Sequence, residues 1–297
     1  MKKIIDFSLI VLLFAVIGFQ TVFSARPAYV ITGYPIKFIF SELTRNVADV
    51  SALVPPGASP HTFAPNPSDI KKVQNAKALF YVSEELDGWA AKIEAKNVIR
   101  LMDYLPAEYR MNFTEPHKHG NESHEAGSDI IDPHFWTDPL AVKALAGKLT
   151  EILVNLDKAN EKSYRDNARI FNARLELLNL QIQARTVQIR GKSVYLFHPS
   201  FRYFIKRYGL NYGGAIEIDP GVEPSARHTG DLLKKIKQSG AKAIFTEPQL
   251  NPGPAKVIAE SIGIKLAQLD PNGGVAGRNN YFDLLFYNMN VLINSLK

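Results

Sequence analysis

Four side chains of this 297-residue sequence have the types that bind a divalent metal ion. Three neutral imidazoles and one carboxylate make a tetrahedral or slightly larger shell of nitrogen and oxygen ligands, which suits zinc. None of the four belongs to a local His-x-x-x-His motif, so only the fold can bring them together. Any one of them taken alone would more often be a structural residue. The candidate ligands are His61, His134, His198 and Asp270.

The elements around these residues predict an α/β fold. Short apolar runs alternate with stretches of helical period, which is typical of parallel sheets covered by helices. Ligands of such sheets bind beyond the carboxyl ends of the strands. His61 follows one predicted strand, His198 and Asp270 each follow another directly, and His134 lies in a turn before a helix. The predicted strands are residues 29–32, 51–54, 78–82, 98–101, 194–197, 243–246 and 266–269.

A long helix is predicted between two halves of similar pattern. Residues 158–189 contain no proline or glycine and carry apolar residues at helical spacing. Residues 69–80 and 231–245 resemble each other as helix–strand units, which favours two lobes of like topology. We therefore expect two α/β lobes with parallel sheets, joined by a rigid helix, with two candidate ligands from each lobe. The expected division is 25–156 for the N-terminal lobe, 157–190 for the helix and 191–297 for the C-terminal lobe.

Four motifs resemble those of the zinc- and manganese-binding solute-binding proteins of ABC importers. They are residues 54–69, 132–139, 197–210 and 269–274, the last followed by Tyr281, Tyr287 and Asn288, and the likeness covers essentially the whole mature chain. The resemblance implies that His61, His134, His198 and Asp270 are the ligands, in a cleft between lobes with little hinge motion. It also implies a membrane permease with its cytoplasmic ATPase as partners. Two positions depart from the family pattern, Pro199 and Asn272, and both could alter how the C-terminal half of the site is held.

The resemblance also favours zinc over manganese. The third ligand resembles a histidine in zinc-type members and a glutamate in manganese-type members, and here it is His198. Manganese favours oxygen ligands, whereas imidazole suits zinc. We therefore expect Zn²⁺ as the transported ion, with Mn²⁺ as the alternative within the same family.

The first 24 residues resemble a secretory signal. Lys2 and Lys3 precede an apolar stretch, and small residues near Ser24 suit cleavage there. The sequence has no cysteine, which excludes disulfides, thiolate ligands and a lipid-anchored cysteine. We expect a periplasmic protein, and we expect a monomer. The formal net charge of +6 comes without an arginine cluster interleaved with aromatic residues, so nucleic acid is not an expected partner.

A second histidine cluster lies in a polar, low-complexity segment, residues 115–129, which contains His117, His119 and His124. Its composition predicts a mobile loop. Zinc-type relatives often carry such a loop before the second ligand, so its histidines are candidates for a secondary metal site, with a solvated surface loop as the equal alternative.

Several other polar or aromatic residues stand near the predicted strand ends and helix starts. We expect His228 and Trp136 to be structural, and Glu217 and Glu247 to border the cleft. Glu247 is either a carboxylate that orients a ligand histidine or, as the commoner case, a satisfied polar residue at a strand end.

Two other classes of protein, zinc hydrolases and metal-binding adhesins, use histidine and carboxylate ligands as well. A zinc hydrolase needs an open coordination position and a nearby general base, and the sequence shows no His-Glu-x-x-His motif. A metal-binding adhesin is suggested by relatives on cell surfaces. We expect a binding protein and no enzyme.

Overall fold

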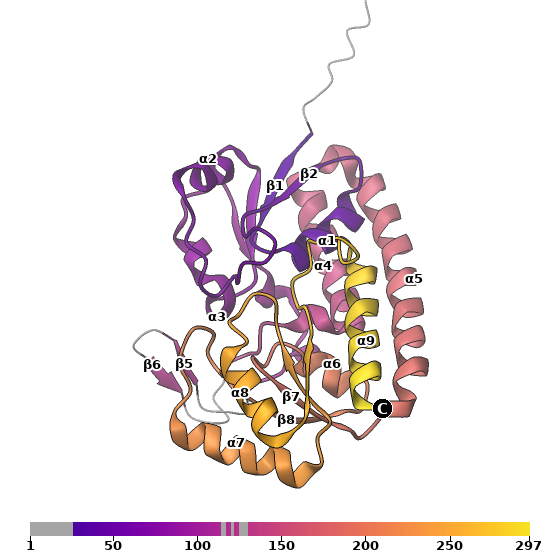
Figure 1. Ribbon diagram of the computed structural model, residues 1–297. Coiled ribbons are helices and arrows are strands. Elements are labelled where there is room, and N and C mark those ends of the chain that lie inside the picture. The colour runs from indigo at the N-terminus through magenta and orange to yellow at the C-terminus, as the bar shows by residue number, and fades with distance from the viewer. Residues whose placement is uncertain (1–25, 114–116, 120–121, 125–129) are drawn as a thin grey trace, which may run out of the picture.

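Two four-stranded parallel sheets form the frame of the protein, as the sequence predicted (Figure 1). The computed structural model describes residues 26–113, 117–119, 122–124 and 130–297. The predicted signal, residues 1–24, lies outside this part of the chain. The first sheet has the strand order β2-β1-β3-β4. Its strands are β1 (Ala28–Ile31), β2 (Asp49–Ala52), β3 (Ala78–Tyr81) and β4 (Val98–Arg100).

The second sheet has the order β10-β9-β7-β8. In both sheets the first strand along the chain lies between the second and the third, and the fourth pairs with the third. The two lobes therefore share one topology, which confirms the internal resemblance seen in the sequence. The strands of this sheet are β7 (Ser193–Leu196), β8 (Asn211–Ala215), β9 (Ala243–Thr246) and β10 (Lys265–Gln268).

Strand β8 is the one strand of the second sheet that the sequence did not predict. It reads Asn-Tyr-Gly-Gly-Ala, and glycine is depleted in strands. The glycines have a packing reason, because a Cβ atom on Gly213 would lie 2.5 Å from the ring of Tyr195 in the neighbouring strand. The close approach of this ring requires a residue without a side chain. Strand propensities do not include such contacts between neighbouring strands.

Helices cover the sheets and join them. The N-terminal lobe contributes α1 (Tyr34–Thr44), α2 (Pro67–Asn75) and α3 (Glu84–Asp87), and the C-terminal lobe α6 (Arg202–Arg207), α7 (Ala226–Ser239) and α8 (Gly253–Ile262). Helices α4 (Pro139–Leu156), α5 (Glu161–Thr186) and α9 (Tyr281–Leu296) run beside both lobes. Short 3-10 helices span Gly88–Lys92, Leu101–Tyr104, Ala107–Tyr109, Phe135–Thr137, Lys158–Asn160 and Val187–Ile189.

Helix α5 is the predicted connector. With the 3-10 turns before and after it, the helical stretch covers 158–189, the range that the sequence predicted. Its 26 residues extend about 39 Å at 1.5 Å per residue. It packs against α1, α4 and α9, with Phe171, Leu175 and Leu178 buried on one face. Among the described residues, no helix combines the length and apolar character needed to cross a bilayer.

The two lobes are also tied directly to each other by the segment 132–138. Tyr203 donates a hydrogen bond to the carbonyl oxygen of Asp132 at 2.9 Å. Arg207 forms an ion pair with Asp138, which also caps α4. The Trp136 indole donates to the carbonyl oxygen of Pro271 at 2.9 Å. These bonds cross from the end of the N-terminal lobe to two parts of the C-terminal lobe, so the lobes are cross-linked close to the cleft.

The predicted mobile loop contains regular backbone. Strands β5 (His117–His119) and β6 (Glu122–His124) pair in an antiparallel hairpin that places His117 opposite His124. A sequence signal was available, because Gly120-Asn121 is a two-residue spacer typical of tight hairpins. The sequence analysis did not predict these two strands, and its prediction that the segment is mobile stays a prediction.

Candidate metal centre

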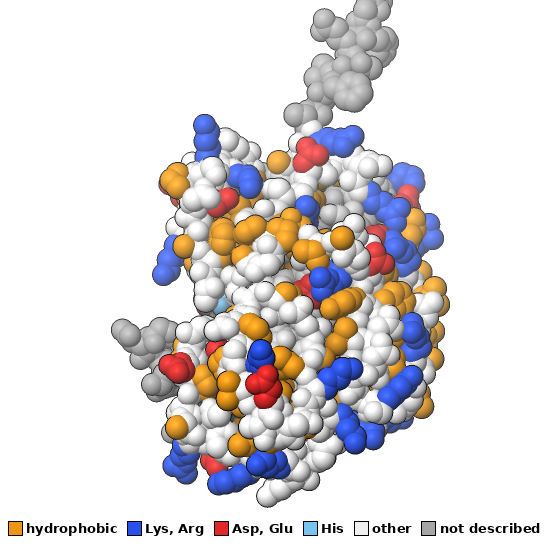
Figure 2. Space-filling model, viewed as in Figure 1, with side chains coloured by type: hydrophobic (Ala, Val, Ile, Leu, Met, Phe, Trp, Pro, Cys, Tyr) orange, Lys and Arg blue, Asp and Glu red, His pale blue; other side chains and the backbone are white. Residues whose placement is uncertain are grey.

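Three of the four predicted ligands meet in the structure. One ring nitrogen from each of His61, His134 and His198 lies within 4.8 Å of the others. The Nε2 atoms of His61 and His134 are 3.4 Å apart. His134 and His198 are buried, whereas His61 is partly exposed. Figure 2 shows the surface hollowed between the two lobes, with a small area of histidine at the back of the hollow.

The spacing of one pair of these nitrogens matches a zinc shell. A tetrahedral zinc ion with bonds of ~2.0–2.1 Å places its nitrogen ligands about 3.3–3.4 Å apart. The Nε2 atoms of His61 and His134 have this separation. The chain thus holds this pair of candidate ligand atoms at the distance that a bound zinc ion requires.

Each histidine comes from a different segment. His61 lies in the turn after β2, where the Trp89 indole donates to the carbonyl oxygen of Pro60 at 2.9 Å and holds the turn in place. His134 immediately precedes the 3-10 helix Phe135–Thr137, and His198 lies two residues beyond β7. Two of the three therefore follow parallel strands, where ligands of α/β sheets are expected.

Each ring also has an oxygen partner on its other nitrogen. Nδ1 of His134 contacts Asp132 Oδ1 at 2.8 Å, and Nδ1 of His61 contacts the carbonyl oxygen of Glu85 at 3.1 Å. Nδ1 of His198 faces Glu247 Oε1 at 3.3 Å. An Nδ1–H that donates to oxygen leaves the Nε2 lone pair for a metal. The partner of His198 makes Glu247 an orienting carboxylate, which the sequence had ranked as the less common case.

The tautomer with a proton on Nδ1 of both rings suits these oxygen partners and leaves a repulsion that a cation relieves. In that tautomer the Nε2 atoms of His61 and His134, 3.4 Å apart, are both acceptors, with no hydrogen atom between them. Two facing lone pairs cannot hydrogen-bond, whereas a metal ion accepts both. The geometry is therefore that of a site prepared for a cation.

Burial keeps the candidate ligand His134 neutral. Desolvation lowers the pKa of His134 below its ordinary value, which favours the uncharged, metal-binding form. Burial alone would raise the pKa of Asp132, but its hydrogen bond with His134 and the positive charge of Arg202 at 3.3 Å lower it. The site thus combines a neutral imidazole with an ionised carboxylate behind it, an arrangement that strengthens the imidazole as a ligand.

Asp270 is buried and stands apart from the histidine group. Its carboxylate is not among the atoms that lie within 4.8 Å of one another. Oδ1 accepts hydrogen bonds from the Gln249 side chain at 2.9 Å and from the backbone N–H groups of Asn272 and Gly273 at 3.0 Å each. Oδ2 lies 3.3 Å from Nε of Arg278. Its role as fourth ligand therefore stays a prediction.

The remaining singled-out residues have protein partners. Nε2 of His228 contacts the carbonyl oxygen of Ala215 at 2.8 Å, a structural role as expected. Trp136 is buried against the His134 ring. Glu217 accepts a hydrogen bond from the Gly221 backbone at 3.3 Å, and burial raises the pKa of its carboxyl group.

The sequence did not reveal which residues hold the candidate ligands in place. Arg202 and Asn288 are buried and contact Asp132 and Asp270, respectively. Asp132 had a local signal, because an acid two residues before a histidine can reach its Nδ1. Arg202 lies within the motif 197–210 and Asn288 follows the motif 269–274, but their roles were not predicted, since they act across 70 and 18 residues of chain.

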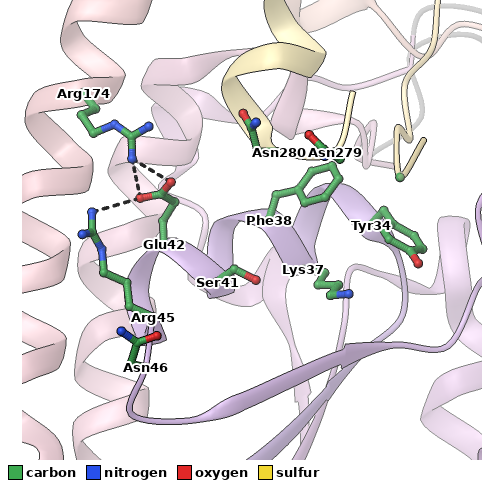
Figure 3. A pocket seen from close by; sticks show the side chains of 11 residues that line it. Tyr34, Lys37, Phe38, Ser41, Glu42, Arg45, Asn46, Arg174, Asn279 and Asn280 are labelled. Atoms are coloured by element: carbon green, nitrogen blue, oxygen red, sulfur yellow. Dashed lines mark hydrogen bonds and ion pairs between the residues drawn. The ribbon is translucent and has the colours of Figure 1, made fainter. Parts of the chain in front are cut away.

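A surface pocket between α1, α5 and the start of α9 is a separate feature (Figure 3). It has a volume of about 660 Å³ and is lined in part by Gly274, Asn279 and Asn280. Glu42, the acidic residue that lines it, is bound by Arg174 at 2.7 Å and by Arg45 at 3.4 Å. A carboxylate already paired with two guanidinium groups has little capacity for a metal ion, so this pocket is no second metal centre.

This chain is similar to several known proteins. A zinc-binding protein AdcA of Streptococcus pyogenes serotype M3 is 26% identical over 92% of this chain, which spans about half (56%) of the relative. The high-affinity zinc uptake system protein ZnuA of Haemophilus ducreyi is 28% identical, over 89% of this chain and 90% of the relative. The solved structure of a laminin-binding protein of Streptococcus agalactiae, described as an adhesin with metal-transporting activity, superposes with a TM-score of 0.76 at 28% identity, covering 92% of this chain and all of that one.

A family match extends over almost the whole described chain. Residues 30–295 match the family described as the periplasmic component A of the zinc-uptake complex. The match spans both lobes and all three clustered histidines, and the two parallel sheets joined by a long helix agree with the resemblance found in the sequence. The chain belongs to this family.

Proposed function

We propose that the protein binds Zn²⁺ outside the cytoplasm and delivers it to the membrane permease of an ABC importer, which works with a cytoplasmic ATPase. The observation that carries the proposal is the histidine group, whose Nε2 atoms of His61 and His134 are 3.4 Å apart while their Nδ1 atoms are engaged elsewhere. The names of the related zinc-binding and zinc-uptake proteins support the choice of ion.

The proposed shell is His61, His134 and His198 with Asp270 as the fourth ligand. Three imidazoles and one carboxylate leave a net charge of +1 on a bound Zn²⁺ ion. Manganese prefers more oxygen ligands than this shell offers. Zinc is therefore the proposed cargo.

Catalysis is not part of the proposal. The two carboxylates beside the histidines, Asp132 and Glu247, each face an Nδ1 atom and have a second partner in Arg202 or Ser200. A carboxylate held in this way orients a ligand and is poorly placed to act as a general base. The arrangement suits a site that holds its ion and later releases it.

The proposal includes the cellular location of the protein and the division of its chain into lobes. Residues 1–24 act as a cleaved signal that directs the protein to the periplasm, where it works as a monomer. The mature chain divides into lobes at 25–156 and 191–297, with residues 157–190 as the connecting helix. The helical stretch 158–189 supports that division.

The hairpin histidines are proposed as a weaker, secondary zinc site. His117, His119 and His124 lie in a segment rich in imidazole and acidic residues, and the backbone places two of them opposite each other. Deleting residues 115–129 should lower the zinc stoichiometry or slow loading, while the tight site stays intact. Unchanged stoichiometry and loading rate would reduce the hairpin to a surface insertion.

The main proposal is tested by metal competition against a chromophoric chelator. Wild type should bind one Zn²⁺ tightly and Mn²⁺ much more weakly. His198→Ala should weaken zinc binding strongly because it opens the shell. His198→Glu should narrow the gap between the two metals by adding an oxygen ligand. Equal binding of both metals by wild type, or unchanged zinc binding by His198→Ala, would contradict the assignment.

A further inference from the structure

We propose that Arg278 is the counter-ion that holds Asp270 in the metal-free protein and yields this carboxylate to zinc, so that Arg278 lowers the affinity of the site and promotes release of the ion. The inference rests on the proposed function, because it assumes that Asp270 is a zinc ligand. It assigns a role to a charged residue outside the ligand set.

The two carboxylate oxygens of Asp270 have different partners. Oδ1 accepts three hydrogen bonds, from the Gln249 side chain and from two backbone N–H groups of its own loop. Oδ2 lies 3.3 Å from Nε of Arg278. Since Oδ1 is saturated by protein donors, Oδ2 is the oxygen with capacity for a metal ion. The group that occupies this oxygen is a guanidinium.

The backbone of Asp270 is fixed, so the exchange concerns the side chain. Its N–H donates to Oδ1 of Asn288 at 2.8 Å, and its carbonyl oxygen accepts from Nδ2 of Asn288 at 2.7 Å. Asn288 is buried in α9 and also bonds the carbonyl oxygen of Leu284. The exchange is therefore one of partner at Oδ2, from the guanidinium of Arg278 to the ion.

A tight backbone turn fixes the position from which Arg278 reaches Asp270. Gly274 N–H donates to the carbonyl oxygen of Arg278 at 2.8 Å, and Arg278 N–H donates to Val275 at 2.9 Å, which closes a tight turn. Gly273 and Gly274 have positive φ, and a Cβ on Gly273 would lie 2.7 Å from the Arg278 carbonyl oxygen. This close approach requires glycine.

The guanidinium of Arg278 also has a supporting ring. It stacks over Tyr287 of α9, 4.3 Å from the ring centroid. The Arg278 side chain is 18% exposed and the Asp270 side chain 2%. Since the ion pair is mostly shielded from water, solvent screens it less than a surface pair. The turn and the ring together place a fixed positive charge beside the proposed ligand.

A fixed positive charge at this place opposes zinc in two ways. It competes for Oδ2 of Asp270, and it repels the divalent ion directly. Both effects weaken zinc binding. A protein that delivers its ion to a permease must bind the ion reversibly. As zinc leaves, Arg278 forms the ion pair with the Asp270 carboxylate again.

The test is zinc affinity measured by chelator competition on the full mature chain. Arg278→Gln should bind zinc roughly tenfold tighter or more, and stopped-flow release to excess chelator should slow accordingly. Arg278→Lys, which keeps the charge, should change the affinity less. Arg169→Gln is the matched control, because it removes an arginine from the exposed face of α5. Thermal melting of each metal-free variant checks that it folds.

A double-mutant cycle separates the ion pair from long-range charge. In an Asp270→Asn background, Arg278→Gln should tighten zinc binding distinctly less than in wild type. Equal tightening in both backgrounds, or unchanged or weaker binding by folded Arg278→Gln, would overturn the inference. Wild-type protein that fails to bind zinc would instead overturn the proposed function. If wild type binds zinc and Asp270→Asn binds it equally well, the inference alone fails.

Discussion

The two lobes share one strand order, and each ends its central strands with a buried carboxylate, yet the two carboxylates serve different purposes. In the N-terminal lobe, Asp87 lies beyond β1 and β3 and accepts hydrogen bonds from the Thr32 hydroxyl at 2.5 Å and from two backbone N–H groups, those of Val82 and Ser83. It ties the strand ends to α3. Its partners are a hydroxyl and backbone amides, and none of them is a candidate ligand.

In the C-terminal lobe the corresponding place is taken by Glu247, directly after β9. It accepts a hydrogen bond from the Ser200 hydroxyl at 2.5 Å and faces Nδ1 of His198 at 3.3 Å. Here the carboxylate orients a proposed ligand. A repeated topology thus provides the same kind of strand-end position twice, but the side chains placed there decide whether it serves stability or metal binding.

The strongest test of this difference between the lobes is to neutralise the carboxylates of Glu247 and Asp87 in turn. Glu247→Gln should weaken zinc binding about 10- to 100-fold, the usual effect of losing a carboxylate behind a ligand histidine. Asp87→Asn should change zinc affinity at most about threefold, because the Glu85 carbonyl oxygen that contacts His61 remains. Chelator competition measures both variants. Similar losses in the two would show that the lobes do not divide their roles as we infer.

The pH dependence of stability should single out Asp87. Burial raises the pKa of Asp87 to about 6, well above ~3.9 for the unfolded chain. Between about pH 4 and pH 6 the folded protein therefore retains a proton that the unfolded chain has lost, so this group's contribution to stability falls as pH rises and levels off above pH 6.

The corresponding measurement compares wild type with Asp87→Asn by chemical denaturation of the metal-free protein at pH 4 to 7. The difference in unfolding free energy should change by at most about 3 kcal/mol across this range, in the direction of wild type losing stability with rising pH. A difference that stays constant with pH would mean that Asp87 titrates normally.

A smaller effect is expected from the two hydroxyl groups that donate to these carboxylates. Ser200→Ala removes one donor to Glu247 and should weaken zinc binding about two- to fivefold, in line with the loss of one hydrogen bond. Thr32→Val removes the matching donor to Asp87 and should lower the melting temperature while zinc affinity stays the same. The opposite pattern would reverse the roles assigned to the lobes.

The smallest effect is expected in overall shape. Small-angle scattering with and without zinc should give the same radius of gyration within error, because the Arg207–Asp138 ion pair, the Trp136–Pro271 hydrogen bond and α5 connect the lobes. A marked compaction on adding zinc would show hinge closure and would contradict cross-linked lobes.

Much of the frame follows from local sequence. Alternating apolar runs gave seven of the eight strands of the two sheets, and an uninterrupted helical pattern gave the 158–189 helix, because hydrophobic period and helix breakers act within a few residues. The exception is β8, in which Gly213 leaves room for the ring of Tyr195 in the neighbouring strand. His61, His134, His198 and Asp270 were found from their places after strands and turns, together with a family resemblance.

By itself, the sequence determined which residues are candidate ligands and which elements carry them, because short motifs of neighbouring residues identify the ligands and the elements. Only the tertiary structure decided that three Nε2-bearing rings converge while Asp270 is paired with Arg278. It also decided that Asp132, Glu247 and the Glu85 carbonyl oxygen orient the rings. The physical reason is distance along the chain. The partners of His61 and His198 lie 24 and 49 residues away, and no local pattern encodes a contact that exists only after the sheets and helices have packed.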